Sequence, residues 1–301
     1  MLRHSAFFYD DDDRMVEQMA PFLFPALAAE NRRAVVALDR LKWKRLARAL
    51  GPTADEVTYI DRDTFYTRPE DAVAGYDAAI RRFVRGGASE IRVFGELPRC
   101  ETEAEQNIWL TYEAILNRAF EQHPVWLMCG YDTREVAGSL LEGAIETHPE
   151  MLTGGWAPNP AYHEPEDVVR SRTPTPAPLE GLHALASGDG ASGFRRALSS
   201  ELDKAGVPED EAKRMVIAAG EVLGNACRHG GESVSVRVGR IGDRFLCEIS
   251  DEGQGIDDPL VGFLPPRPGH TDGAGLWVAR QLTRQLELVP AAQGATVRLW
   301  I

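Results

Sequence analysis

A proline-rich stretch in the middle of the sequence divides the chain into two parts with different hydrophobic patterns. Residues 154–178 carry closely spaced prolines and little apolar periodicity, which is typical of an extended connector. The 301 residues are enough for two domains of ordinary size. We therefore predict a first domain at 1–153, a proline-rich linker at 154–182 and a second domain at 183–301.

In the first part, short apolar runs alternate with longer amphipathic stretches. This order predicts an α/β fold in which a doubly wound parallel sheet is covered by helices on both faces. The sequence has no P-loop motif, and no complete dinucleotide-binding glycine motif follows a predicted strand, so both of these nucleotide-binding classes are excluded. The predicted strands are Ser5–Tyr9, Ala34–Leu38, Val57–Ile60, Ile91–Phe94 and Val125–Cys129.

The last third of the sequence carries polar and glycine-rich motifs that point to a nucleotide pocket. Glu221 and Asn225 stand four residues apart in a predicted helix, so their side chains lie on one helical face. Asp251 ends a predicted strand, and Gly253 and Gly255 follow at once. Glycines at these positions permit tight turns and the close approach of a ligand to the backbone.

A third motif follows about twenty residues later. Gly273 and Gly275 precede a helical stretch that begins with Leu276, and a glycine-rich helix N-terminus suits an anion such as phosphate. Strict alternation at Val234, Val236 and Val238 predicts a strand with one buried face. The second domain is therefore predicted to be an α/β sandwich with a largely antiparallel sheet.

In this order, the motifs resemble the N box and the two glycine boxes of the GHKL ATPases, the class of gyrase, Hsp90, histidine kinases and MutL. The resemblance implies ATP and Mg²⁺ as cofactors. Asn225 would hold Mg²⁺, Asp251 would accept a hydrogen bond from the adenine amino group, and Glu221 would act as the general base. The segment Gly273–Gly275 would cover the phosphates. The residues assigned to cofactor binding are Asn225, His229, Asp251, Gly253, Gly255, Gly273, Gly275 and Leu276.

Within this class, residues 184–301 resemble the RsbW-type anti-sigma-factor serine kinases. The first motif ends in His229-Gly, the gap from Gly255 to Gly273 is short, and the sequence ends at the last predicted strand. The resemblance implies a cytoplasmic protein that holds a sigma factor inactive and phosphorylates a serine of an anti-anti-sigma (STAS) protein. Members of this family commonly form homodimers. One departure is Ala274, where those kinases often carry arginine, so a cation near the phosphates is missing.

Two other functions stay open on the sequence alone. Because of Ala274, the second domain could be a nucleotide-gated module that sequesters a partner without phosphorylating it. A sensor histidine kinase would need a phosphate-accepting histidine on a helix before the ATP domain. The candidate is His183, which lacks the usual acidic neighbour.

The first domain resembles the MEDS sensory domain over about 4–153. The resemblance implies a fold related to RecA/KaiC-type domains that lack the P-loop, and a sensory role. We predict a pocket for a small-molecule signal near the strand ends, where open α/β sheets bind ligands; the alternative is that its residues are ordinary core residues. These residues are His4, Cys129, Tyr131 and His148. The resemblance rests on His4, Phe8-Tyr9, Tyr112–Asn117, Leu127–Asp132 and His148-Pro149.

Composition sets further bounds on function. A formal net charge of −13 argues against nucleic acid as a direct partner. No apolar run is long enough to span a membrane, and the N-terminus lacks the features of a signal peptide, so we expect a cytoplasmic protein. The spacing of the cysteines predicts neither a zinc site nor a disulfide framework. They are Cys100, Cys129, Cys227 and Cys247.

Overall fold

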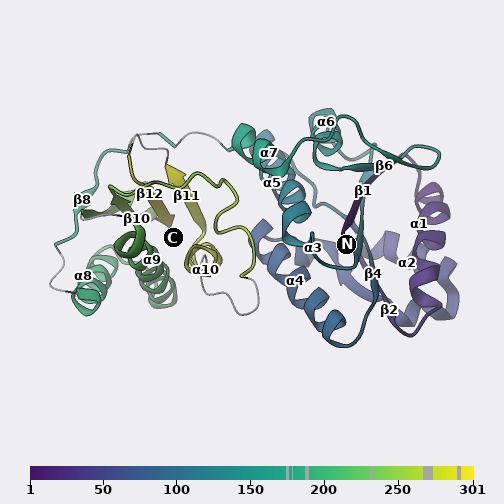
Figure 1. Ribbon diagram of the computed structural model, residues 1–301, viewed down its shortest axis with the longest axis horizontal. Helices are drawn as coiled ribbons and strands as arrows, with labels where there is room; N and C mark the ends of the chain where they lie inside the picture. Colours follow the sequence, from purple (N-terminus) through teal and green to yellow (C-terminus); the bar gives the residue numbers. More distant parts are fainter. Residues whose placement is uncertain (174–175, 178, 187–189, 231–232, 267–273, 290–292) are drawn as a thin grey trace. The chain divides into compact units, whose positions relative to one another are not determined.

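The computed structural model divides into two compact units, Met1–Thr173 and Pro174–Ile301, each built around its own sheet (Figure 1). The structure describes the chain except for 174–175, 178, 187–189, 231–232, 267–273 and 290–292.

The first unit has a seven-stranded sheet in the order β3-β2-β4-β5-β1-β6-β7. Neighbouring strands are parallel from β3 to β6, and β7 is antiparallel to β6. All five predicted strands are present. The strands are β1 (Arg3–Tyr9), β2 (Arg32–Leu38), β3 (Thr58–Asp61), β4 (Glu90–Glu96), β5 (Val125–Asp132), β6 (Glu150–Leu152) and β7 (Trp156–Pro158).

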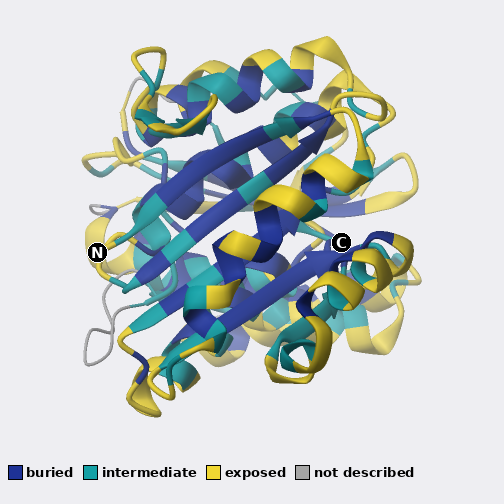
Figure 2. Ribbon diagram, turned by 90° about the vertical axis from the view of Figure 1, so that its right-hand side faces the viewer, coloured by how far each residue is buried: buried dark blue, intermediate teal, exposed yellow. Residues whose placement is uncertain are grey.

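Helices cover both faces of this sheet, which confirms the doubly wound fold. Val36, Phe94 and Met128 pack in one core with apolar side chains of α1 and α2. Val93 and Leu127 point to the opposite face, where they meet tyrosines of α4 and α5. Figure 2 shows the strands of this sheet as mostly buried. The helices are α1 (Asp12–Leu27), α2 (Arg40–Leu50), the short 3-10 helix η1 (Gly51–Glu56), α3 (Arg62–Phe65), α4 (Pro69–Arg85), α5 (Glu103–Ala119), α6 (Gly138–Thr147) and α7 (Pro165–Arg172).

The segment predicted as a linker is folded onto the first unit over much of its length. Strand β7 pairs with β6, and α7 packs against α5. Arg118 of α5 forms ion pairs with Glu164 at 2.9 Å and Glu166 at 2.8 Å. Pro165 starts α7, because a proline at the first helical position lacks only an amide that would be unpaired anyway. The first unit therefore extends to Thr173, well past the expected boundary at 153.

The second unit has a five-stranded sheet in the order β11-β12-β10-β9-β8, with antiparallel neighbours. Apolar side chains of α8, α9 and α10 form one core with the sheet, and Val238 is fully buried in it as the alternation predicted. These features confirm the α/β sandwich. Its elements are β8 (His183–Ala184), α8 (Gly190–Lys204), α9 (Glu209–His229), β9 (Val234–Ile241), β10 (Arg244–Asp251), α10 (Ala274–Leu282), β11 (Gln285–Val289) and β12 (Thr296–Trp300).

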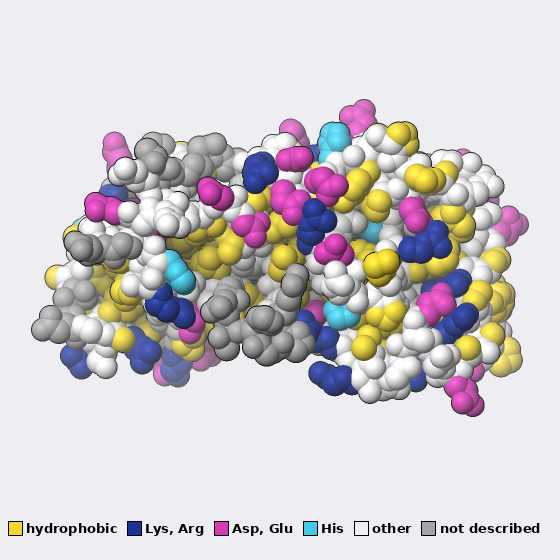
Figure 3. All heavy atoms as spheres, viewed as in Figure 1, with side chains coloured by type: hydrophobic (Ala, Val, Ile, Leu, Met, Phe, Trp, Pro, Cys, Tyr) yellow, Lys and Arg dark blue, Asp and Glu magenta, His cyan; other side chains and the backbone are white. Residues whose placement is uncertain are grey.

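The surface of both units is mixed in charge. On the face shown in Figure 3, acidic and basic side chains are interspersed with apolar ones. Within the described part of the chain, no helix has the length and apolar character needed to cross a membrane.

Candidate functional site

The start of α10 lies directly against two polar side chains of α9. A Cβ atom on Gly275 would lie 3.0 Å from Asn225 Nδ2 and 3.2 Å from Glu221 Oε2. The missing side chain at Gly275 thus lets the first turn of α10 approach both groups closely. Because a helix N-terminus carries a partial positive charge and unpaired amides, this place suits an anionic group.

Asp251, at the end of β10, is held by the backbone of two neighbouring loops. Its Oδ1 atom accepts hydrogen bonds from the Gly253 amide at 2.9 Å and the Ala295 amide at 3.2 Å. Gly230, which follows α9, packs so closely that a Cβ there would lie 2.4 Å from the Cβ of Asp251. Asp251 Oδ2 makes no hydrogen bond to a described residue, so one edge of a fixed carboxylate remains available to a ligand.

The other predicted residues of the nucleotide pocket take different positions. The side chain of His229 is exposed, and its carbonyl oxygen lies against Gly253, where a Cβ would be 2.4 Å away. Gly255 has a φ of 84°, a conformation that favours glycine. Leu276 is buried in the core of the unit. Gly273 lies outside the described residues.

The arginine that contacts Asn225, a residue predicted to bind the nucleotide, was not itself predicted. Arg228 lies one helical turn after Asn225 on α9, and its Nη2 atom donates a hydrogen bond to Asn225 Oδ1 at 2.7 Å. The sequence did offer a signal for this contact, since residues three apart are neighbours on a helix.

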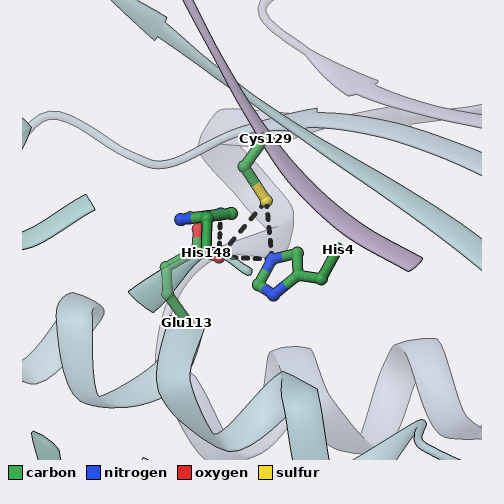
Figure 4. A group of neighbouring side chains, drawn as sticks. All are labelled: His4, Glu113, Cys129 and His148. Carbon is green, nitrogen blue, oxygen red and sulfur yellow. Dashed lines mark hydrogen bonds and ion pairs between the residues drawn. The ribbon is translucent and has the colours of Figure 1, made fainter. Parts of the chain in front are cut away.

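A second group of polar side chains meets inside the first unit (Figure 4). The carboxylate oxygen Oε2 of Glu113 lies 3.2 Å from His4 Nε2, 3.2 Å from Cys129 Sγ and 3.4 Å from His148 Nε2. Cys129 Sγ also lies 3.3 Å from His4 Nε2. The four atoms all lie within 4.8 Å of one another. We call His4, Glu113, Cys129 and His148 the His–Cys–Glu cluster.

The cluster lies under the sheet rather than at the strand ends where we expected a pocket. His4 is the second residue of β1, and Cys129 pairs with Ala6 on the neighbouring strand, so both side chains point to the face covered by α5. Tyr131, the fourth predicted residue, stacks edge-on against His148 at 5.8 Å between ring centroids. Of the four residues predicted for the sensory pocket, His4, Cys129 and His148 therefore lie in one cluster, and Tyr131 lies beside it.

Glu113 was missed by the sequence analysis, although it lies in a stretch that carries the family resemblance. It is 1% exposed and stands between apolar neighbours on α5. A lone acidic residue in an apolar helical stretch is a usable signal, because a buried charge needs a partner.

Burial sets the protonation of the cluster. Desolvation, followed by the nearby charge of His148, lowers the pKa of His4. Desolvation and the carboxylate of Glu113 raise the pKa of the Cys129 thiol well above its usual range. Desolvation also raises the pKa of Glu113, but the close contacts of its carboxylate with the imidazoles of His148 and His4 outweigh desolvation and hold that pKa at about 2. A carboxylate thus faces a neutral imidazole and a neutral thiol.

Another buried charged group lies at the carboxyl ends of the strands. Lys42 Nζ lies 3.0 Å from Glu96 Oε2 and 3.1 Å from Asp132 Oδ2, and it donates to the Tyr9 hydroxyl at 2.7 Å. Arg62 also donates to Glu96 at 3.0 Å. Because these charges are paired with one another, the group ties β1, β4 and β5 to α2 and α3.

The fold of the second unit and the residues at its predicted nucleotide site together define its class of protein. An antiparallel sheet with helices on one face, an acid and an amide on α9, and glycines that bring β10 and α10 close to that helix define a GHKL-type ATPase domain.

Comparison with protein families agrees with this class. Residues 186–301 match the family described as "Histidine kinase-like ATPase domain", and residues 3–149 match "MEthanogen/methylotroph, DcmR Sensory domain", abbreviated MEDS. The chain therefore consists of a MEDS sensory domain followed by a histidine kinase-like ATPase domain. No curated protein matches the chain. The combination is that of a regulatory signalling protein, and its second domain implies ATP binding.

Proposed function

We propose that this protein is an ATP-dependent anti-sigma factor with serine kinase activity, controlled by its sensory domain. The observation that carries the proposal is the close approach of Gly275 to Glu221 and Asn225, together with Asp251, whose carboxylate is fixed at the end of β10 by two backbone amides. The substrate would be a serine of a STAS-domain protein, and the protein held inactive would be a sigma factor.

Each side chain of the pocket has a role that its position supports. The open edge of the Asp251 carboxylate would accept a hydrogen bond from the adenine amino group. Asn225 Oδ1 would hold Mg²⁺, which neutralises charge on the phosphates. The N-terminus of α10 would receive the phosphate oxygens. Glu221 would take the proton of the attacking serine hydroxyl. The serine oxygen would bond to the γ-phosphorus as the bond from that phosphorus to ADP breaks.

Arg228 supports phosphoryl transfer in spite of Ala274. Its guanidinium contacts Asn225 Oδ1, the same oxygen that Mg²⁺ would occupy. If Asn225 Oδ1 held Mg²⁺, the guanidinium of Arg228, one helical turn after Asn225, would be available to the phosphates, and its positive charge would replace the arginine missing at 274.

The test is a phosphoryl-transfer assay with labelled ATP, Mg²⁺ and STAS proteins that co-purify with the full chain. Glu221→Gln should bind ATP as the parent does but lose transfer by about 100-fold or more, because a general base acts only in the transition state. The control is Glu209→Gln, an exposed position on the same helix, which should transfer at the parental rate.

Two results would count against the proposal. Equal transfer by Glu221→Gln and the parent would remove Glu221 from the chemistry. Nucleotide-dependent capture of a sigma factor without any transfer would favour the other candidate function, a binding module gated by nucleotide, to which Ala274 points.

A further inference from the structure

The hydrogen bonds around the His–Cys–Glu cluster determine which way its imidazole rings point. Asn117 Nδ2 donates to the carbonyl of Thr147 at 2.9 Å and to that of Ala114 at 3.3 Å, so its Oδ1 is the acceptor that faces His4 Nδ1 at 3.0 Å. His4 Nδ1 therefore carries the proton. In the neutral ring, Nε2 then presents a lone pair to Glu113 and Cys129.

His148 is oriented in the same way. Its Nδ1 lies 2.7 Å from the Ala144 carbonyl, which can only accept a hydrogen bond. Its Nε2 is fully buried, lies 3.4 Å from Glu113 Oε2 and makes no hydrogen bond to any residue that the structure describes. Nδ1–H bonds to an amide oxygen and to a backbone carbonyl are the outer contacts that metal-ligating histidines usually make, because they fix the tautomer and the ring.

The cluster has too few protons for its contacts. Two imidazole nitrogens, a carboxylate oxygen and a sulfur converge, and the thiol of Cys129 carries one proton for all of them.

The spacing of the four atoms fits a tetrahedral metal ion. With metal–ligand distances of about 2.0–2.3 Å, ligand atoms of a tetrahedral zinc site lie roughly 3.3–3.8 Å apart. Four of the six distances between the cluster atoms are 3.2–3.4 Å, and all six are within 4.8 Å. A divalent ion with one thiolate and one carboxylate also has no net charge, so it could be buried without an uncompensated charge.

From this geometry we propose that His4, Glu113, Cys129 and His148 bind one divalent metal ion of the zinc class inside the MEDS domain. The ligand set selects the metal, because imidazole and thiolate together favour Zn²⁺ over Mg²⁺ or Ca²⁺. The ion joins β1, β5, α5 and the segment after α6, which are the elements that supply the four ligands.

A small pocket reaches the metal site from one side. Glu113 and Cys129 line it together with Tyr66, Tyr76 and Tyr112. The hydroxyl of Tyr112 is buried and makes no hydrogen bond within the described part of the chain, and neither does that of Tyr131 beside His148.

The test uses the full chain, stripped of metal with a chelator and titrated with Zn²⁺ and with Co²⁺. We expect one equivalent of Zn²⁺ to bind with release of protons, since the thiol must deprotonate. The Co²⁺ form should show thiolate-to-cobalt charge transfer and the intense visible bands of a tetrahedral ion. Weak, sub-stoichiometric binding, or a cobalt spectrum without the thiolate band, would overturn the proposal and leave a cluster that holds protons only.

Variants assign the ligands. Cys129→Ser should abolish the charge-transfer band, whereas Cys100→Ser, in the same unit but outside the cluster, should leave spectrum and affinity unchanged. Asn117→Ala should weaken Zn²⁺ binding by about 10- to 100-fold through loss of the contact to His4, with the band retained. Zinc affinity unaffected by either Cys129→Ser or Asn117→Ala would contradict the site. If Cys129→Ser does not fold, the spectrum of the parent decides by itself.

Discussion

Asp132 is a buried carboxylate whose charge depends on its hydrogen-bond partners. Arg134 donates to both carboxylate oxygens, at 2.8 and 2.6 Å, and Lys42 lies 3.1 Å away. Burial raises the pKa of Asp132, but the hydrogen bonds from Arg134 and Lys42 outweigh it and hold that pKa well below its usual range. The ionised form is therefore favoured by folding.

This shift predicts a pH-dependent effect of Asp132→Asn. A carboxyl whose pKa is lower in the folded state stabilises the fold above its unfolded pKa, about 3.9, and this stabilisation is lost as the pH falls toward the folded value. Asp132→Asn should lower the free energy of unfolding by about 1–3 kcal/mol near pH 7, and the difference should shrink below about pH 4. Urea unfolding at several pH values measures both.

The exposed Asp55 provides the control, and Asp55→Asn should leave the free energy of unfolding unchanged at every pH. A deficit in Asp132→Asn that is the same at acid and neutral pH would show that packing, rather than charge, is what the substitution removes.

The placement of the residues proposed for the ATP site could be predicted from the sequence because each motif is local. Glu221 and Asn225 share a helix, and Asp251 and Gly253 share a turn, so spacing alone places each pair together. The His–Cys–Glu cluster could not be predicted in this way. Its members are far apart in the chain, and only the parallel pairing of β1 with β5 and the packing of α5 bring them together. Cysteine spacing carries no trace of such a site.

At the scale of elements, α5 and α6 are packed through a glycine. A Cβ on Gly143 of α6 would lie 2.2 Å from Leu110 Cδ1 of α5, whereas a Cβ on Gly138 at the start of α6 would meet nothing within 4 Å. The two glycines therefore form a matched pair on one helix, one at a tight contact and one in open space.

Gly143→Ala should destabilise the first unit by about 1–3 kcal/mol, because the added methyl group overpacks the contact with Leu110. Gly138→Ala should be neutral or slightly stabilising, since alanine favours the helix. Thermal unfolding of both variants beside the parent measures this. Equal midpoints for the two variants would show that the Leu110 side chain can move aside without a cost in stability.

The strands and most helices of both domains follow from apolar periodicity, but the linker does not. Dense proline between 154 and 173 predicted an extended connector, yet this segment forms β7 and α7. Its stability comes from tertiary partners, namely the pairing of β7 with β6 and the ion pairs of Arg118 with Glu164 and Glu166. Local composition contains no information about partners that lie far away in the chain.

At the scale of the whole molecule, the two units should fold separately, because each has its own sheet and its own core. Fragments 1–173 and 174–301 should each be soluble and unfold cooperatively, and the second should bind ATP with the affinity of the full chain. Calorimetry and circular dichroism of the two fragments check this. A second fragment that is folded but does not bind ATP would show that the sensory domain completes the nucleotide site.

We propose that the second domain binds Mg²⁺–ATP with Asp251 at the adenine. Isothermal calorimetry of the full chain tests it most directly, with Asp251→Ala compared with Asp243→Ala, a control in the exposed turn between β9 and β10. We expect Asp243→Ala to bind ATP as the parent does. Asp251→Ala should lose about 1–3 kcal/mol of binding free energy, because the adenine amino group is left without its acceptor. Binding of ATP by Asp251→Ala with parental affinity would contradict it.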